Sequence, residues 1–246
     1  MDRMLYVAMT GAKQNMLAQG MTSNNLANVS TSGFKADLHA ARAMPVYGEG
    51  HPTRVYAMTE KSGIDFSPGV LQATGRQLDV AVENEGFIAV QSPTGNEAYT
   101  RAGNLRVTTA GLLTTAGGHP VMGDGGIISI PPYTKLDISR DGTISIVPVG
   151  ASAEAVEVVD RIKLVNPDVR QLYKANDSLF RLKNNQPAEA DNSVTVLNGN
   201  LEGSNVNIAD TMVGMIELAR QFEMQVKMMK LTEENDAKAA QLLQMA

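Results

Sequence analysis

Apolar positions at the two ends of the chain recur every three or four residues. In the C-terminal stretch Val206 to Ala246, which has no proline and one glycine, Gly214, this spacing places them on one helical face. The stripe consists of Ile208, Met212, Met215, Ile216, Ala219, Phe222, Val226 and Met229. Asn207 offers a side-chain oxygen to the first turn, and Asp210 follows three residues later, as in a capping box. A helix this long would measure about 55–60 Å and would need another helix to cover its stripe.

Residues 1–28 show a weaker version of the same period. An approximate heptad seam runs through Leu5, Met9, Ala12, Met16, Gln19, Ser23 and Leu26, and two of its members are polar. Such a helix is marginal alone, so we expect a partner to order it. The polar run Ser30 to Ser32 and Gly33 mark its end.

The middle of the chain changes from no period to a period of two. Prolines and glycines interrupt Phe34 to Arg76, where we expect an extended linker with one or two short strands near Thr53–Met58, or a plain loop. From Leu78 onward, short alternating runs separated by glycine turns predict a domain of strands, and Asp141-Gly142 predicts a hairpin. The predicted fold class is α+β, divided into an N-terminal helix at 1–32, a linker at 33–75, a β-rich domain at 76–200 and a C-terminal helix at 201–246.

Composition narrows the possible functions. A formal charge of −5 argues against nucleic acid or an anionic membrane as the main partner. The absence of cysteine excludes disulfides and thiol chemistry. No segment is long and apolar enough to span a membrane, and the run Met4 to Met9 is too short for a cleaved signal peptide. Export would therefore depend on another signal.

The residues that could carry chemistry do not form a recognisable site. His39, His51 and His119 lack the spacing of metal ligands. The glycines between Gly111 and Gly126 match no nucleotide-binding motif, and no G-x-S-x-G is present. We therefore predict no catalytic, cofactor-binding or metal-binding residues. The 14 methionines cluster at both ends, where their flexible side chains suit packing against different neighbours.

Three blocks of residues occur in a characteristic order. The first is Ser23-Asn24-Asn25-Leu26-Ala27-Asn28 followed by Thr31-Ser32-Gly33-Phe34-Lys35. The second combines Leu78 to Val82, Gly86-Phe87, Tyr99 to Leu105 and Gly111 to Thr115. The third is Leu201 to Asn207 with Met215-Ile216 and Arg220 to Glu223. Together they resemble the bacterial flagellar rod and hook proteins over nearly the whole chain.

Within this family, the start Met1-Asp2 with Tyr6 to Ala12 most resembles a proximal rod subunit. The alternative is a distal rod protein. Distal rod proteins typically have Lys-Arg after the Gly-Phe pair and a longer insertion there, whereas this chain continues Lys35-Ala36-Asp37-Leu38.

The resemblance implies a structural subunit without enzymatic activity or cofactor. Such proteins pass unfolded through the flagellar type III apparatus without a cleaved signal peptide, and stack helically into the torque-transmitting shaft that crosses the periplasm. The family implies that the terminal helices pair as a coiled coil lining the inner tube, with the β domain outside. It also implies other proximal rod proteins, the distal rod protein and further copies of this chain as partners. Nucleic acid, a small-molecule substrate and direct membrane insertion are not expected.

The signatures and helical stripes together predict the subunit interface. Its predicted residues are Leu5, Met9, Met16, Asn24, Asn25, Leu26, Asn28, Phe34, Asn205, Val206, Met212, Met215, Ile216, Phe222, Val226 and Met229. Two other classes of function compete with this interpretation. An enzyme or ligand-binding β protein would need a cleft with convergent polar groups. A cytoplasmic coiled-coil adaptor would not be exported.

Overall fold

The computed structural model describes residues 3–47, 55–152 and 155–244. The chain divides into two compact units. The helical unit comprises Met1–Asn28, Ala36–Asp65 and Val206–Ala246, and the β unit comprises Val29–Lys35 and Phe66–Asn205. Each unit therefore combines segments that lie far apart in the sequence. Neither described helix is long and apolar enough to cross a membrane.

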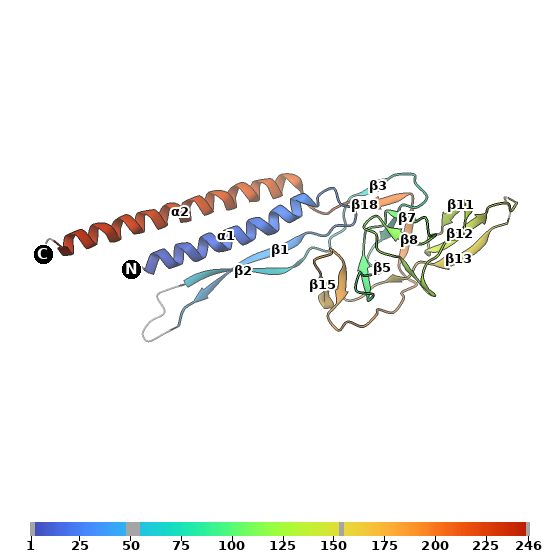
Figure 1. Cartoon of the computed structure of the whole chain (residues 1–246), viewed down its shortest axis with the longest axis horizontal. Coiled ribbons are helices and arrows are strands. Elements are labelled where there is room, and N and C mark those ends of the chain that lie inside the picture. The colour runs from blue at the N-terminus through green and yellow to red at the C-terminus, as the bar shows by residue number, and fades with distance from the viewer. Residues whose placement is uncertain (1–2, 48–54, 153–154, 245–246) are drawn as a thin grey trace. The chain divides into compact units, whose positions relative to one another are not determined.

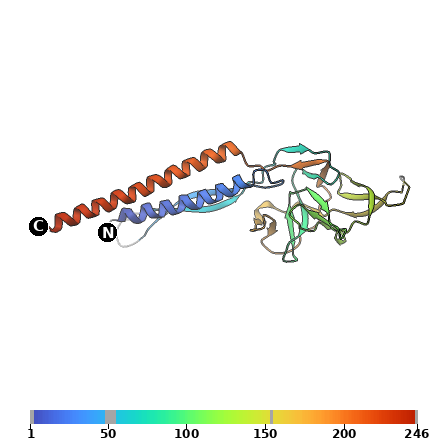
Figure 2. The same ribbon diagram turned by 45° about the horizontal axis from the view of Figure 1, so that its top comes forward.

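The helical unit contains the two predicted terminal helices. Helix α1 (Arg3–Ala27) and helix α2 (Ile208–Gln244) lie side by side and run in opposite directions (Figures 1 and 2). The predicted cap of α2 is present, because Asn207 Oδ1 accepts the backbone N–H of Ala209 at 3.0 Å, and Asn207 Nδ2 donates to Asp210 Oδ2 at 2.7 Å. The two terminal stretches therefore form the expected helices.

Helix α1 packs through small side chains. Ala8, Ala12 and Ala18 are buried, and a Cβ placed on Gly11 would lie 3.0 Å from the side chain of Gln225. Small residues let two helix backbones approach closely, but they bury little apolar area. Helix α2 has 37 residues against 25 in α1, and its side chains from Glu233 to Gln241 are exposed.

A long β hairpin completes the helical unit. Strands β1 (Asp37–Pro45) and β2 (Val55–Ile64) pair antiparallel, and β2 packs on α1. Gln14 Oε1 accepts the N–H of Thr59 at 2.9 Å. These strands exceed the short strands expected near Thr53–Met58. Most β1 side chains are exposed, so the sequence there lacks the alternation that marks a half-buried strand. Residues 53–54 of that prediction lie outside the described residues.

The β unit consists of short antiparallel strands. A five-stranded sheet has the order β14-β5-β6-β16-β15, a three-stranded sheet has the order β11-β12-β13, and the remaining strands form the pairs β17-β4, β18-β3, β7-β8 and β10-β9. The strands are β3 (Leu71–Ala73), β4 (Val80–Glu83), β5 (Phe87–Gln91), β6 (Glu97–Thr100), β7 (Leu105–Val107), β8 (Leu113–Thr115), β9 (Met122–Gly123), β10 (Gly126–Ile127), β11 (Tyr133–Ile138), β12 (Thr143–Pro148), β13 (Glu157–Arg161), β14 (Leu164–Val165), β15 (Leu172–Lys174), β16 (Phe180–Leu182), β17 (Thr195–Asn198) and β18 (Asn200–Glu202). A single 3-10 turn, Val169–Gln171, precedes β15 in the described chain. The central region is therefore β-rich, as predicted.

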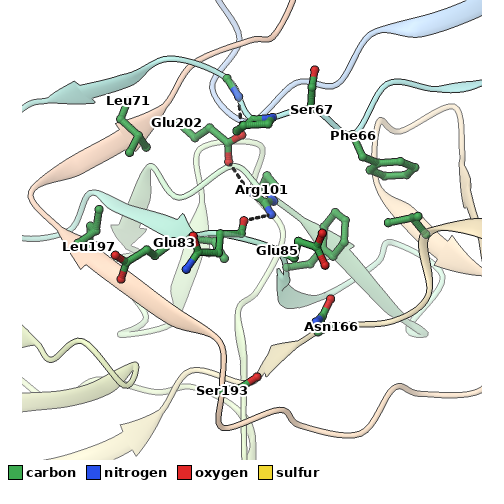
Figure 3. Close-up of a pocket in the computed structure, with 16 residues that line it drawn as sticks. Phe66, Ser67, Leu71, Glu83, Glu85, Arg101, Asn166, Ser193, Leu197 and Glu202 are labelled. Carbon is green, nitrogen blue, oxygen red and sulfur yellow. Dashed lines mark hydrogen bonds and ion pairs between the residues drawn. The ribbon is translucent and has the colours of Figure 1, made fainter.

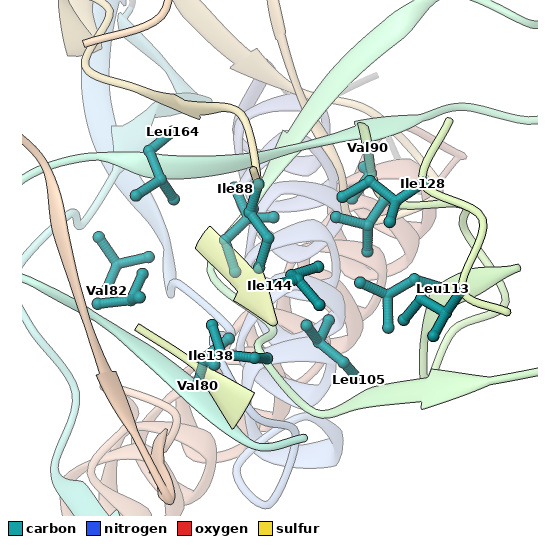
Figure 4. Packing of buried hydrophobic residues seen from close by; sticks show 14 of the residues in the cluster. Val80, Val82, Ile88, Val90, Leu105, Leu113, Ile128, Ile138, Ile144 and Leu164 are labelled. Atoms are coloured by element: carbon teal, nitrogen blue, oxygen red, sulfur yellow. The ribbon is translucent and has the colours of Figure 1, made fainter. Parts of the chain in front are cut away.

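One cluster of aliphatic side chains forms the core of the β unit. Val80, Ile88, Leu105, Leu113 and Ile144 come from five different strands and have no solvent exposure (Figure 4). Burial of each such side chain contributes about 1.5–3 kcal/mol. The predicted Asp141-Gly142 hairpin connects β11 and β12, with Gly142 at φ 86°. The β unit thus has a core of its own.

Candidate functional site

Three charged residues from distant parts of the sequence form a buried ion cluster in the β unit. Lys35 Nζ lies 2.6 Å from Glu202 Oε1, and Arg101 Nη1 lies 2.9 Å from Glu202 Oε2. The side chains of Lys35 and Glu202 are 0% and 1% exposed. Lys35, Arg101 and Glu202 each belong to a different one of the three sequence blocks. One carboxylate therefore joins the N-terminal, central and C-terminal blocks.

Backbone groups make further hydrogen bonds with the three side chains, of which Figure 3 shows Arg101 and Glu202 with the ion pair that joins them. Lys35 Nζ donates to Ser67 O at 2.7 Å, and the N–H of Gly69 donates to Glu202 Oε1 at 2.9 Å. Arg101 Nε donates to the carbonyl of Gly86 at 2.8 Å. A buried ion pair is tolerated only when such partners offset the loss of water. Removing one charge would leave the others uncompensated.

The pKa of Glu202 reflects two opposing effects. Burial raises the pKa of this carboxyl, but hydrogen bonds from Lys35 and Gly69, and the charge and hydrogen bond of Arg101, outweigh burial. The net pKa of Glu202 lies below its ordinary value. The carboxylate is therefore ionised at neutral pH and serves as the anionic centre of the cluster.

Local backbone geometry places the three charges. Glu202 ends β18 and pairs with Leu71 of β3. Gly33 has φ 68° and donates its N–H to the carbonyl of Glu202 at 2.8 Å, and a Cβ there would come within 2.2 Å of the backbone of Arg101. Only glycine fits this position, because the backbone is left-handed and the neighbouring chain is too close.

An open cavity of about 1220 Å³ lies beside the cluster (Figure 3). Its apolar wall includes Phe66 and Phe87, whose ring centres are 6.0 Å apart. Of its titratable lining groups, Arg101 and Glu202 bind each other, Glu83 pairs with Arg140 at 2.6 Å, and Glu85 is exposed. The cluster therefore uses its charges to hold chain segments together, which is a structural arrangement.

The predicted interface residues occupy three kinds of environment. Five are exposed: Met9, Met16, Asn24, Met212 and Ile216. Ten are half-buried: Leu5, Asn25, Leu26, Asn28, Asn205, Val206, Met215, Phe222, Val226 and Met229. Phe34 is buried, and Lys174 Nζ lies 3.7 Å from the centre of its ring.

The predicted stripe of α2 divides between two faces. Met215, Phe222, Val226 and Met229 recur at helical spacing on the half-buried side, and α1 is the element that packs on α2. These four residues therefore lie on the side of α2 that other parts of the chain partly cover. Met212 and Ile216 are 51% and 53% exposed and lie outside this half-buried side.

The predicted interface asparagines of the first and third sequence blocks make hydrogen bonds within the chain. Asn25 Nδ2 donates to Asp37 O at 2.9 Å, and the N–H of Asp37 donates to Asn25 Oδ1 at 3.0 Å, so Asn25 binds the start of β1 as a neighbouring strand would. Asn28 Nδ2 donates to Asn24 O at 2.9 Å, and Asn205 Nδ2 donates to Ser67 Oγ at 3.2 Å. These residues position the chain where the helices and hairpin begin or end.

Sequence reasoning missed two groups of residues. The first group is Lys35, Arg101 and Glu202. In the sequence these are only charged positions within the three blocks, and no local pattern connects them. Exposed apolar side chains were also missed on both helices: Tyr6, Leu17, Val213, Met224 and Leu231. The available signal was a second helical period, because Val213, Met224 and Leu231 follow one another at eleven and seven residues and Tyr6 and Leu17 lie eleven residues apart.

Family models match three regions of the chain. The model described as flagellar basal body rod FlgEFG protein C-terminal matches residues 197–242. The flagellar hook protein FlgE/F/G D1 domain matches residues 81–146, and the flagella basal body rod protein model matches residues 5–35.

Full-length relatives carry related names. The flagellar basal-body rod proteins FlgF of Salmonella typhimurium and Escherichia coli are 43% and 42% identical to this chain over 252 residues, with 100% of each chain covered. The flagellar basal-body rod protein FlgG of Bacillus subtilis is 30% identical over 258 residues, covering 95% of this chain and 96% of its own length.

Proposed function

This chain belongs to the flagellar basal-body rod protein family, and on that premise we propose that it is a structural subunit of the proximal rod. The observation that carries the proposal is the identity of 43% to a FlgF protein over the full length of both chains. A distal rod subunit is the second candidate, favoured by the 30% identity to a FlgG protein. The lower identity, and Ala36 where distal rod proteins typically have arginine, make it the weaker one.

In the proposed assembly, subunits stack helically and transmit torque. The pairing of α1 with α2 supports a coiled-coil inner layer lining the tube. We propose, from the family resemblance, that the β unit forms the outer layer. The two layers then have different tasks: the helices form the continuous tube, and the β units contact their neighbours around it.

The proposed interface has two parts. Met215, Phe222, Val226 and Met229 hold α2 against α1 within a subunit. The exposed residues Met9, Met16, Met212 and Ile216 contact neighbouring subunits, because an apolar stripe on a helix is stable in water only when another surface covers it. The neighbours we propose are other proximal rod proteins, the distal rod protein and further copies of this chain.

The proposed location is the rod of the basal body, where it crosses the periplasm. We propose that the chain reaches it through the flagellar type III apparatus without a cleaved signal peptide, and that it acts by assembly and not by catalysis. The ion cluster of Lys35, Arg101 and Glu202 suits a subunit of a shaft that transmits torque, because it holds three segments of the chain together under load.

The test is to place a tagged copy in a flagellated bacterium that lacks its own FlgF protein. We expect swimming to return and the tagged chain to be present in purified basal bodies. Recovery of the chain only from the cytoplasm, without swimming, would favour an adaptor and contradict the proposal. Rescue of a strain lacking FlgG, but not of one lacking FlgF, would favour the distal rod.

A further inference from the structure

A groove in the helical unit contains a glycine that the chain's own packing does not require. The groove has a volume of about 390 Å³ and is lined by α1, the start of β1, and residues of α2 that include Gly214, Glu217 and Gln221. A Cβ at Gly214 would meet no atom within 4 Å. Glycine weakens a helix interior, so a packing reason for it must come from outside the subunit.

An exposed face of α2 that includes the groove residues Glu217 and Gln221 combines apolar and acidic side chains. Val213, Glu217, Gln221 and Met224 follow one another at steps of four, four and three, which places them on one helical face. Val213 and Met224 are 56% and 58% exposed. Glu217 is exposed and has no ion pair among the residues that the structure describes. This face fits a helix that carries apolar residues and a cation.

Such a surface is present on α1 of the same chain. Its outward face carries Met9, Lys13, Met16 and Gly20 at steps of four, three and four, with Leu17 beside them. Met16 and Leu17 are 65% and 50% exposed, and Lys13 is exposed without an ion pair in the described part of the chain. Helix α1 contains no acidic residue, so its charge complements Glu217.

Resting on the proposed function, we infer that α1 of a second copy of this chain docks antiparallel along α2 at this groove. In a helical stack, copies related by rotation about and translation along one axis keep their helix directions, so a neighbour's α1 runs opposite to α2. If Lys13 lies opposite Glu217, then Met16, three residues further along α1, lies opposite Gly214, three residues earlier on α2. Leu17 then lies opposite Val213.

This register explains why residue 214 is glycine. The Met16 side chain enters the space that a side chain at residue 214 would fill, as a knob enters a hole. Lys13 and Glu217 fix the register, because a shift of one turn would separate the two charges. The groove volume of about 390 Å³ is large enough for a few side chains of a docked helix, while the backbone of that helix lies on the surface above the groove.

The absence of cysteine from the chain permits a direct test. Two differently tagged copies, M16C and G214C, are produced in one cell, and basal bodies are isolated under mild oxidation. We expect a disulfide-linked product carrying both tags. The matched control is M16C with E223C, because Glu223 is exposed and lies nine residues from Gly214, on the opposite side of α2. No product with both tags in the first pair, or equal product in the control pair, overturns the inference.

A charge exchange covers the case in which the cysteine variants do not assemble. We expect K13E and E217K each to lower the number of basal bodies about tenfold or more, and K13E with E217K in one chain to restore it. Singles that assemble as the parent does, or a double variant that restores nothing, overturn the inference. If the unsubstituted tagged chain is itself missing from basal bodies, the proposed function fails and not only this contact.

Discussion

Glu202 supplies the negative charge on which two buried cations depend. In E202Q, Lys35 and Arg101 stay buried without a counter-charge, so we expect a loss of about 3–5 kcal/mol in the free energy of unfolding. Urea denaturation followed by circular dichroism measures it. The control is E85Q, which lies on the same cavity but is exposed, and should change the free energy of unfolding by less than about 0.5 kcal/mol. Equal stability of E202Q and the parent would contradict the assigned role.

The same carboxyl predicts the direction of a pH effect. Since the folded-state pKa of Glu202 lies below its ordinary value of 4.5, its stabilising contribution is complete well above pH 4.5 and is lost as the pH falls through the lowered pKa. We therefore expect the stability difference between the parent and E202Q to shrink as the pH is lowered below about 4.5. A difference that stays constant from neutral to strongly acidic pH would exclude Glu202 as its source.

At the scale of single elements, the sequence pattern predicts those elements whose buried side chains recur with a regular period. Helices α1 and α2, the Asn207 cap and the Asp141-Gly142 hairpin were all predictable, because each depends on neighbours within a few residues. The hairpin β1-β2 was expected only as a linker with short strands, since its side chains are mostly exposed and its order comes from Gln14 and Asn25 on α1. The Lys35–Glu202 pair joins positions 167 residues apart, which no local pattern reveals.

Phe222 tests the contact between α1 and α2. It is half-buried, three residues after Ala219 and four before Val226, on the half-buried side of α2, and α1 is the element that packs on α2. In F222D we expect a cost of roughly 3 kcal/mol or more from the lost ring, with desolvation of the carboxylate in addition. The helix content of the chain should fall, and no complete rod should form.

The control for this variant lies beyond the paired part of α2. Lys238 is exposed, so K238D should retain helix content and swimming. The β unit contains neither residue and should unfold as in the parent. Cells that carry F222D and build complete basal bodies would show that the α1–α2 contact does not depend on this seam.

At the scale of the whole molecule, the two units differ in how much apolar area they bury. The β unit has a core of buried valine, isoleucine and leucine side chains, whereas the buried apolar residues described on α1 are alanines. The helical unit therefore gains less free energy from burial, and large apolar side chains on its outer faces gain none until a neighbour covers them. A subunit built this way completes its helical layer only on joining the assembly.

Limited digestion of the full-length chain with trypsin checks this difference. In dilute solution we expect early cleavage at Lys13, Lys227 and Lys230, because the helix pair opens at low free-energy cost, and a resistant fragment close to residues 66–205. In isolated basal bodies the same lysines should be protected, since neighbouring subunits then cover the helices. Mass spectrometry of timed samples identifies the fragments. If the β unit of the dilute chain is cleaved as fast as the helices, the assigned difference in stability is wrong. If α1 and α2 are cleaved in basal bodies as fast as in solution, the rod does not bury them.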